Sequence, residues 1–126
     1  MKAVDTNLLV RLVTWDSASQ VAAAEEFIRG GAWVSVLALA EAIWVLADIY
    51  GLNVSQQVSG LEVLLSHVDL VIQEEDMVRR AVESFRAHPA LGFSDCLMVE
   101  IARQAGHLPL GTFDRKLAKL DGTQRI

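Results

Sequence analysis

The sequence predicts an α/β fold, a three-layer α/β/α sandwich with a mainly parallel central sheet. Three observations support this prediction. Short apolar runs of strand character alternate along the chain with longer segments of helical character. The segments between successive runs are long enough to be the crossover helices that parallel strands require. The length of 126 residues is that of one domain, so we expect residues 1–126 to form a single domain.

The expected elements follow from apolar patterning and from residues that start and stop helices. A short apolar run at the N-terminus ends at Asp5, where the helical pattern of DTNLLVRLV begins. Asp16 or Ser17 can cap the next helix, which stops at Gly30 and Gly31. Further helices are expected at 37–51, from a cap at Ser55 to 67, and at 75–87, 94–105 and 114–120. Strands are expected at 2–5, 32–36, 68–72 and 108–112, with a short edge strand at 124–126.

The composition is that of a globular protein without a disulfide framework. Hydrophobic residues make up 52% of the chain and charged residues 21%. The single cysteine, Cys96, lies in an apolar run, where a core residue is a better interpretation than a nucleophile. No apolar stretch approaches the ~20 residues that cross a bilayer, and the N-terminus does not resemble a signal peptide. We therefore expect a soluble, cytoplasmic protein that is not bound to a membrane.

Four acidic residues stand where the predicted fold places its functional crevice, near the carboxyl ends of parallel strands. Asp5 ends the first expected strand, and Asp114 follows the strand that ends at Thr112. Glu41 lies about one turn into the helix after the second strand, and Asp95 opens the helix before the last long strand. Because these acids come from four separate segments, we expect their carboxylates to converge on one crevice.

Converging carboxylates repel one another unless protons or cations neutralise them. Mg²⁺ and Mn²⁺ are oxygen-seeking ions that bind through a few carboxylates and retain several waters. One or two such ions would polarise a phosphodiester, activate an attacking water and stabilise the leaving oxygen. The acids therefore favour phosphodiester hydrolysis that needs no protein nucleophile.

Each of these acids also has a purely structural explanation. Asp95 can complement a helix dipole beside a cap at Ser94, and Asp5 can form a turn with its neighbours. The last of the four acids can cap the short helix that follows it. Glu41 lies among apolar residues and can pair with an arginine such as Arg11. The joint occurrence of four acids near strand ends is what favours the metal site.

Four motifs carry these acids: VDTNLLVRL, SVLALAEAIWVL, GFSDCLMVEIARQAG and LGTFDRKLAKLDG. Together, and in this order, they resemble the PIN-domain family and, within it, the VapC-type toxins of bacterial toxin–antitoxin pairs. The resemblance spans essentially the whole chain. It implies a PIN-like α/β/α sandwich, Mg²⁺- or Mn²⁺-dependent endoribonuclease activity and inhibition by a cognate antitoxin protein.

The resemblance also implies roles for individual residues. Asp5 of VDTN and Asp95 of FSDCL would bind the metal directly, while Glu41 and Asp114 would bind it directly or through water. Two polar residues would support the carboxylates or orient a bound water, namely Asn7 and Thr112.

Basic and aromatic residues indicate further contacts. The net charge of −5 argues against a nucleic-acid partner without excluding one, because bound cations would offset the four acids. Candidates for phosphate contacts are Arg115, Lys116 and Lys119, together with Arg79, Arg80 and Arg86, of which Arg79 and Arg86 are better interpreted as solvated residues. Homodimers are usual in the family that the chain resembles. Trp33 and Trp44 are candidates for the dimer surface, although core packing is the default expectation for both.

Two other α/β classes also gather acids around Mg²⁺, and the sequence disfavours both. A receiver domain needs an aspartate after a middle strand, but Gln73, Glu74 and Glu75 follow the third expected strand. The DxDxT motif of aspartyl-phosphate phosphatases is absent, since Thr6 and Asn7 follow Asp5. The remaining alternative is a catalytically silent interaction module that acts only through an antitoxin, for instance in autorepression.

Overall fold

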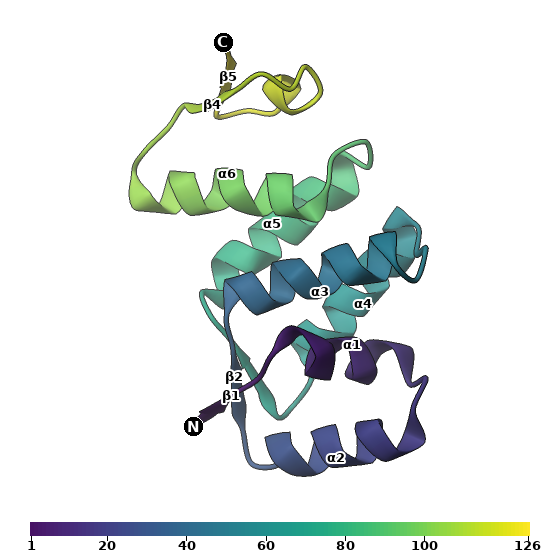
Figure 1. Ribbon diagram of the computed structural model, residues 1–126. Coiled ribbons are helices and arrows are strands. Elements are labelled where there is room, and N and C mark those ends of the chain that lie inside the picture. Colours follow the sequence, from purple (N-terminus) through teal and green to yellow (C-terminus); the bar gives the residue numbers. More distant parts are fainter. The chain divides into compact units, whose positions relative to one another are not determined.

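Parallel strands and helices alternate along the chain, as the sequence predicts (Figure 1). A computed structural model describes all residues from 1 to 126. The chain divides into two compact units, Met1–Glu75 and Asp76–Ile126. Both units contain helices and parallel strands, so the predicted α/β class is confirmed.

The first unit contains a parallel sheet of three strands in the order β1-β2-β3. Its elements are β1 (Lys2–Ala3), α1 (Thr6–Thr14), α2 (Ala18–Ile28), β2 (Ala32–Val34), α3 (Val36–Asp48), α4 (Val54–Ser66) and β3 (Leu70–Ile72). Residues of the two longer strands alternate between a buried face and an exposed face. Ala32 and Val34 are buried, whereas Trp33 and its register partner Val71 are exposed.

The second unit contains two long helices and a separate pair of parallel strands. Its elements are α5 (Glu75–Ala87), α6 (Phe93–Ala105), β4 (Leu110–Thr112), the 3₁₀ helix η1 (Leu117–Lys119) and β5 (Thr123–Arg125). A final strand therefore forms, parallel to β4. The helix expected at 114–120 is reduced to a turn followed by the 3₁₀ helix. Pro109 precedes β4, because a residue without an N–H group cannot donate within a strand pair.

The helix caps agree with the sequence-based predictions at α2 and correct them at α4 and α6. Ser17 caps α2, as predicted. The cap of α4 is Asn53 and not Ser55, because Asn53 and Gln56 each accept a hydrogen bond from the other's backbone N–H at 2.9 Å. The cap of α6 is Gly92 and not Ser94.

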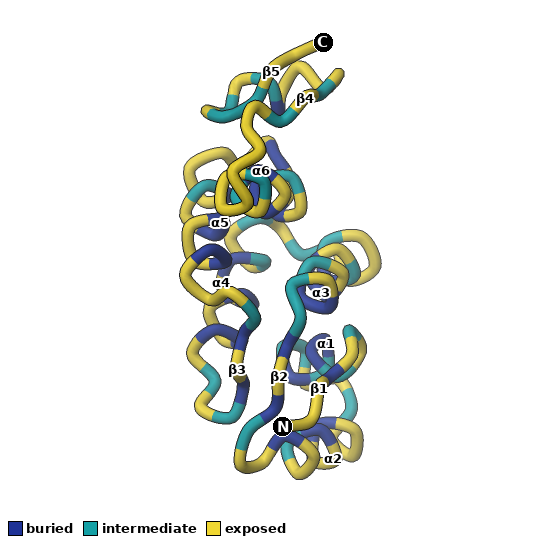
Figure 2. The backbone as a smooth tube through the Cα atoms, turned by 90° about the vertical axis from the view of Figure 1, so that its left-hand side faces the viewer, coloured by how far each residue is buried: buried dark blue, intermediate teal, exposed yellow.

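The buried side chains follow the apolar stripes of the helices. Figure 2 shows buried and exposed segments alternating along α1 and α3, as expected of helices that cover a core with one side. In the second unit Phe85 and Phe93 are buried with their ring centroids 6.0 Å apart. Cys96, on the same helix as Phe93, is fully buried, and burial raises the pKa of its thiol. The interpretation of Cys96 as a core residue is thus confirmed.

Two of the tryptophans, Trp33 and Trp44, are not packed in the core as expected. Trp33 is 37% exposed and Trp44 is 59% exposed, so core packing is wrong for both. Trp33 projects from the outer face of β2, and Trp44 lies on the exposed side of α3. No helix combines the length and the apolar character needed to span a bilayer.

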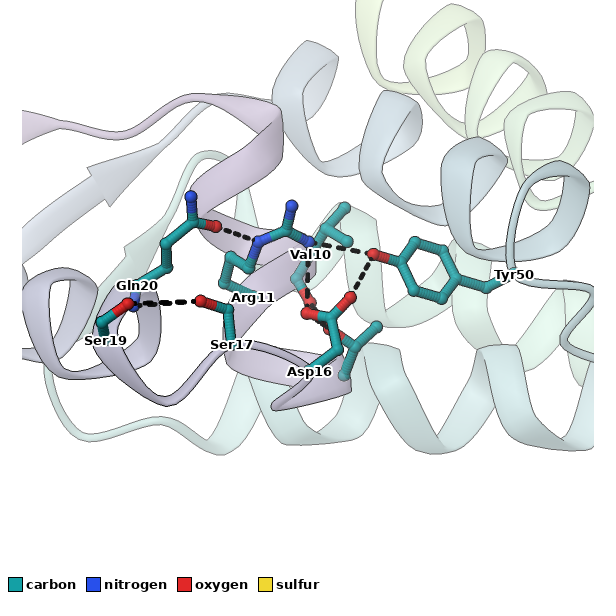
Figure 3. Close-up of polar contacts among 8 residues, drawn as sticks. Val10, Arg11, Asp16, Ser17, Ser19, Gln20 and Tyr50 are labelled. Atoms are coloured by element: carbon teal, nitrogen blue, oxygen red, sulfur yellow. Dashed lines mark hydrogen bonds and ion pairs between the residues drawn. The ribbon is translucent and has the colours of Figure 1, made fainter.

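A polar network ties the ends of α1 and α3 to the start of α2 (Figure 3). Arg11 donates to the side chain of Gln20 and to the hydroxyl of Tyr50, the latter at 2.9 Å. The Tyr50 hydroxyl donates to Asp16 at 2.7 Å, and Arg11 forms an ion pair with Asp16 at 3.3 Å. The hydrogen bond from Tyr50, then that from Thr14, and the charge of Arg11 lower the pKa of Asp16 below its ordinary value of 3.8.

Tyr50→Phe is expected to weaken the first unit in a pH-dependent way. Because the pKa of Asp16 is lowered by folding, ionised Asp16 stabilises the fold above its ordinary pKa, and this contribution is lost as the pH falls through the folded pKa. The difference in Tm between the native protein and Tyr50→Phe should therefore be largest near neutral pH and shrink below about pH 4. Thermal unfolding followed by circular dichroism across this range measures it. A difference independent of pH would show that Tyr50 acts only through packing and its bond to Arg11.

Candidate active site

Asp5 stands at the junction between β1 and α1, as expected for the first strand end. It is the N-cap of α1, and its Oδ1 accepts the backbone N–H of Leu8 at 3.0 Å. An aspartate satisfies this role well, because a short carboxylate reaches the free N–H groups of the first turn and complements the helix dipole. Asp5 is exposed, and its second carboxylate oxygen accepts no hydrogen bond from the protein.

Glu41 lies on the second turn of α3 and reaches back to the start of α1. Its Oε2 accepts a hydrogen bond from the Thr6 hydroxyl at 3.1 Å. The structure thus brings Glu41 to the residue that follows Asp5. Glu41 is exposed and pairs with no arginine, so the alternative ion pair with Arg11 is wrong. Arg11 is instead engaged by Asp16, Gln20 and Tyr50.

The start of α3 is held by residues at the ends of the two neighbouring strands. Ser35, directly after β2, accepts the N–H of Ala38 at 3.1 Å. Gln73, directly after β3, accepts the N–H of Val36 at 2.9 Å through its side chain. These bonds fix the direction in which α3 leaves the sheet, and with it the position of Glu41. No site role was expected of Gln73 or of Thr6, although Thr6 lies within the VDTNLLVRL motif.

In the second unit Asp95 is the third residue of α6. Its Oδ2 accepts the backbone N–H of Gly92 at 3.2 Å, and the side chain is half-buried. The expected helix-terminal role of Asp95 is therefore present, with Gly92 in place of Ser94 as the neighbouring cap.

Asp114 lies in the tight turn after β4. Its backbone N–H donates to the Thr112 hydroxyl at 3.0 Å, and its Oδ1 accepts the N–H groups of Lys116 at 2.7 Å and Leu117 at 3.2 Å. Thr112 therefore helps to hold the turn that presents Asp114. Asp114 is exposed, and its other carboxylate oxygen accepts no hydrogen bond from the protein.

The four acids share one feature, which Asp69 also shows, since its Oδ1 accepts the N–H of Gly30 at 3.3 Å and it forms no ion pair. In each carboxylate one oxygen is held by a hydrogen bond from the protein, and the other accepts none. None of the four forms an ion pair with a lysine, arginine or histidine. A carboxylate with one anchored and one free oxygen suits a divalent cation that prefers oxygen ligands. The donor set therefore fits Mg²⁺ or Mn²⁺.

Asp5 and Glu41 belong to the first unit, and Asp95 and Asp114 belong to the second. No three side chains of Asp, Glu, His or Cys are gathered into a metal-ligating cluster. The convergence of all four carboxylates on one crevice thus stays a prediction.

Asn7 lies next to the acids in sequence but lines a different feature. Together with Leu8, Arg11, Gln20 and Phe27 it borders a pocket of about 340 Å³ between α1 and α2. Its side chain makes no hydrogen bond to Asp5 or Glu41, so its supporting role toward the carboxylates stays a prediction.

Some basic residues form ion pairs with acidic residues, and others have no acidic partner. Arg80 pairs with Glu100, and Arg86 pairs with Glu83. Three exposed side chains around the Asp114 turn have no acidic partner, namely Arg115, Lys116 and Lys119. Arg125 of β5 lies in register with Thr112 and is likewise exposed and unpaired, a neighbour that only the strand pairing reveals.

The α/β fold and these carboxylates define an acidic protein equipped to hold divalent metal ions. Its sequence matches the PIN domain family over residues 2–123. The protein therefore belongs to the PIN-domain family, whose members are typically metal-dependent nucleases. The match covers all four acids. A comparison with curated proteins finds no match.

Proposed function

We propose that this protein is a metal-dependent endoribonuclease and the toxin of a VapBC-type toxin–antitoxin pair, acting in the cytoplasm. The observation that carries the proposal is the PIN-domain match over residues 2–123, which contains four acids whose carboxylates are available to a cation. Each holds one oxygen in place through the protein and leaves the other free, and none is neutralised by a basic side chain.

The residues that would hold the metal are the four carboxylates, with Asp5 and Asp95 as direct ligands and Glu41 and Asp114 as direct or water-mediated ones. When bound, Mg²⁺ or Mn²⁺ supplies Lewis-acid activation of water for attack on the phosphodiester. The protein contributes fixed carboxylate orientations through the backbone N–H groups of Leu8, Gly92, Lys116 and Leu117. No serine, cysteine or histidine nucleophile is required.

The unpaired cations near Asp114 would contact the RNA backbone. Arg115, Lys116, Lys119 and Arg125 are exposed and can approach phosphates without first breaking an ion pair. Such a local positive surface would allow binding of RNA by a chain whose net charge is −5.

The protein partners that we propose are a cognate antitoxin and a second copy of the chain. Leu37 and Trp44 are 67% and 59% exposed and lie seven residues apart on α3, which places them on one side of the helix. Large apolar side chains grouped on a surface commonly mark an interface. We propose that the dimer surface is centred on Trp44 and leaves Glu41, one turn earlier on α3, accessible to the metal.

The activity is tested by incubating the purified protein with total cellular RNA in Mg²⁺ or Mn²⁺, in EDTA, and after metal is restored to the EDTA sample. We expect discrete products with metal, none in EDTA and recovery on restoration, because chelation removes the activating ion. The absence of cleavage under every condition would contradict the proposal and favour the silent interaction module.

A further inference from the structure

The hydroxyl of Thr6 is the one side-chain group of this protein that donates a hydrogen bond to any of the four candidate metal ligands. It joins Glu41 to the start of α1 over a distance of 3.1 Å and a sequence separation of 35 residues. The other three acids are anchored by backbone N–H groups within their own turns. Glu41 has no such backbone donor, because it lies inside α3, where N–H groups bond within the helix.

A glutamate on an exposed helical surface has three rotatable side-chain bonds and considerable conformational entropy. Without a fixed donor, the Glu41 carboxylate would sample several rotamers. The Thr6 hydroxyl restricts it by holding Oε2, which leaves Oε1 as the free ligand atom. Thr6 itself is restricted, because it is the first residue of α1 and Asp5 caps that helix.

From this geometry we propose that Thr6 is a positioning residue for the metal site, which aligns the free oxygen of Glu41 with the carboxylate of Asp5. This inference rests on the proposed function, since it assigns a role toward the same metal. Thr6 contacts neither substrate nor metal and acts through Glu41. Loss of an outer contact of this kind lowers metal affinity by roughly 10–100-fold.

The test measures Mn²⁺ binding to the full chain by isothermal titration calorimetry, and RNA cleavage as a function of Mn²⁺ concentration. Thr6→Val keeps the size and branching of the side chain and removes only the hydroxyl. We expect weaker Mn²⁺ binding by roughly 10-fold or more. The half-saturating Mn²⁺ concentration for cleavage should rise in parallel, with the rate largely recovered at saturating Mn²⁺. Thr6→Ser restores the hydroxyl and should recover most of the affinity.

Thr14→Val is the matched control. Thr14 lies on the same helix, and its hydroxyl also makes hydrogen bonds, to Val10 and Asp16, each at 2.9 Å. Its removal should lower Tm without changing Mn²⁺ affinity. The Tm of Thr6→Val in EDTA shows whether that variant is folded.

The outcomes separate the two hypotheses. If the native protein neither binds Mn²⁺ nor cleaves RNA, the proposed function fails. If it does both and Thr6→Val binds Mn²⁺ equally well, the role of Thr6 is overturned while the function stands. A Thr6→Ser affinity as low as that of Thr6→Val would overturn it too, because the methyl group would then be responsible. In a Glu41→Gln background, Thr6→Val should cause no further loss, and an additional loss of similar size would show that Thr6 does not act through Glu41.

Discussion

Asp5→Asn is expected to abolish metal-dependent cleavage while leaving the protein folded. The substitution removes the charge of a proposed direct ligand and replaces one oxygen by an amide nitrogen, which cannot coordinate a cation. Even the loss of an outer contact costs roughly 10–100-fold in metal affinity or activity, so we expect a decrease of more than about 100-fold for a ligand. Mn²⁺ titration and the RNA cleavage assay measure the two effects separately.

Asp5→Asn separates the two roles of Asp5, because it affects metal binding and helix capping differently. Asp5 is a proposed metal ligand, and it is the N-cap of α1. Asparagine caps helices about as well as aspartate, so the cap is kept and Tm in EDTA should change little. Asp5→Ala removes the cap as well and should cost about 1 kcal/mol of stability in addition. Asp48→Asn neutralises an acid elsewhere in the first unit and serves as the charge control. Full Mn²⁺ binding by Asp5→Asn would mean that Asp5 is only a helix cap.

Phe85→Ala is expected to destabilise the fold more than any of the substitutions at polar residues. Phe85 is 1% exposed and packs against Phe93 in the second unit, with ring centroids 6.0 Å apart. Truncation leaves a cavity and loses the aromatic contact, which costs about 3–5 kcal/mol. Since a domain of this size is stabilised by only about 5–15 kcal/mol, a large share of the stability would be lost. Urea unfolding followed by circular dichroism measures the change.

The same variant tests whether residues 1–126 behave as a single domain. All three tryptophans lie in the first unit, whereas Phe85 lies in the second. A single cooperative domain predicts that the tryptophan fluorescence transition shifts by as much as the circular dichroism transition. We expect coincident shifts. A fluorescence midpoint that stays at its native value would show that the two units unfold independently.

Local sequence patterns predicted most of the secondary structure. The helix expected at 75–87 has these bounds, and Ser17 caps α2 as its residue type indicates. Such features depend on neighbours within a few residues, so the sequence around them carries the necessary information. The choice of Asn53 over Ser55 as the cap of α4 was missed, although the reciprocal pairing with Gln56 is a signal within the sequence.

The acids could also be found from the sequence, for a different reason. Asp5 and Asp114 follow predicted strands, and topology makes this position meaningful, since open parallel sheets present their functional residues at that edge. The four motifs around these acids lie within the PIN-domain match over residues 2–123.

The sequence by itself therefore determined the α/β class, the order of the elements, the family and the candidate acids. Only the tertiary structure decided which partner each side chain has. It assigned Arg11 to Asp16 and Tyr50 instead of Glu41, joined Glu41 to Thr6, and exposed Trp44 where a core position was expected. The physical reason is distance along the chain. Thr6 and Glu41 are 35 residues apart, and a contact of this kind arises only when two helices pack in one particular register, which no local pattern encodes.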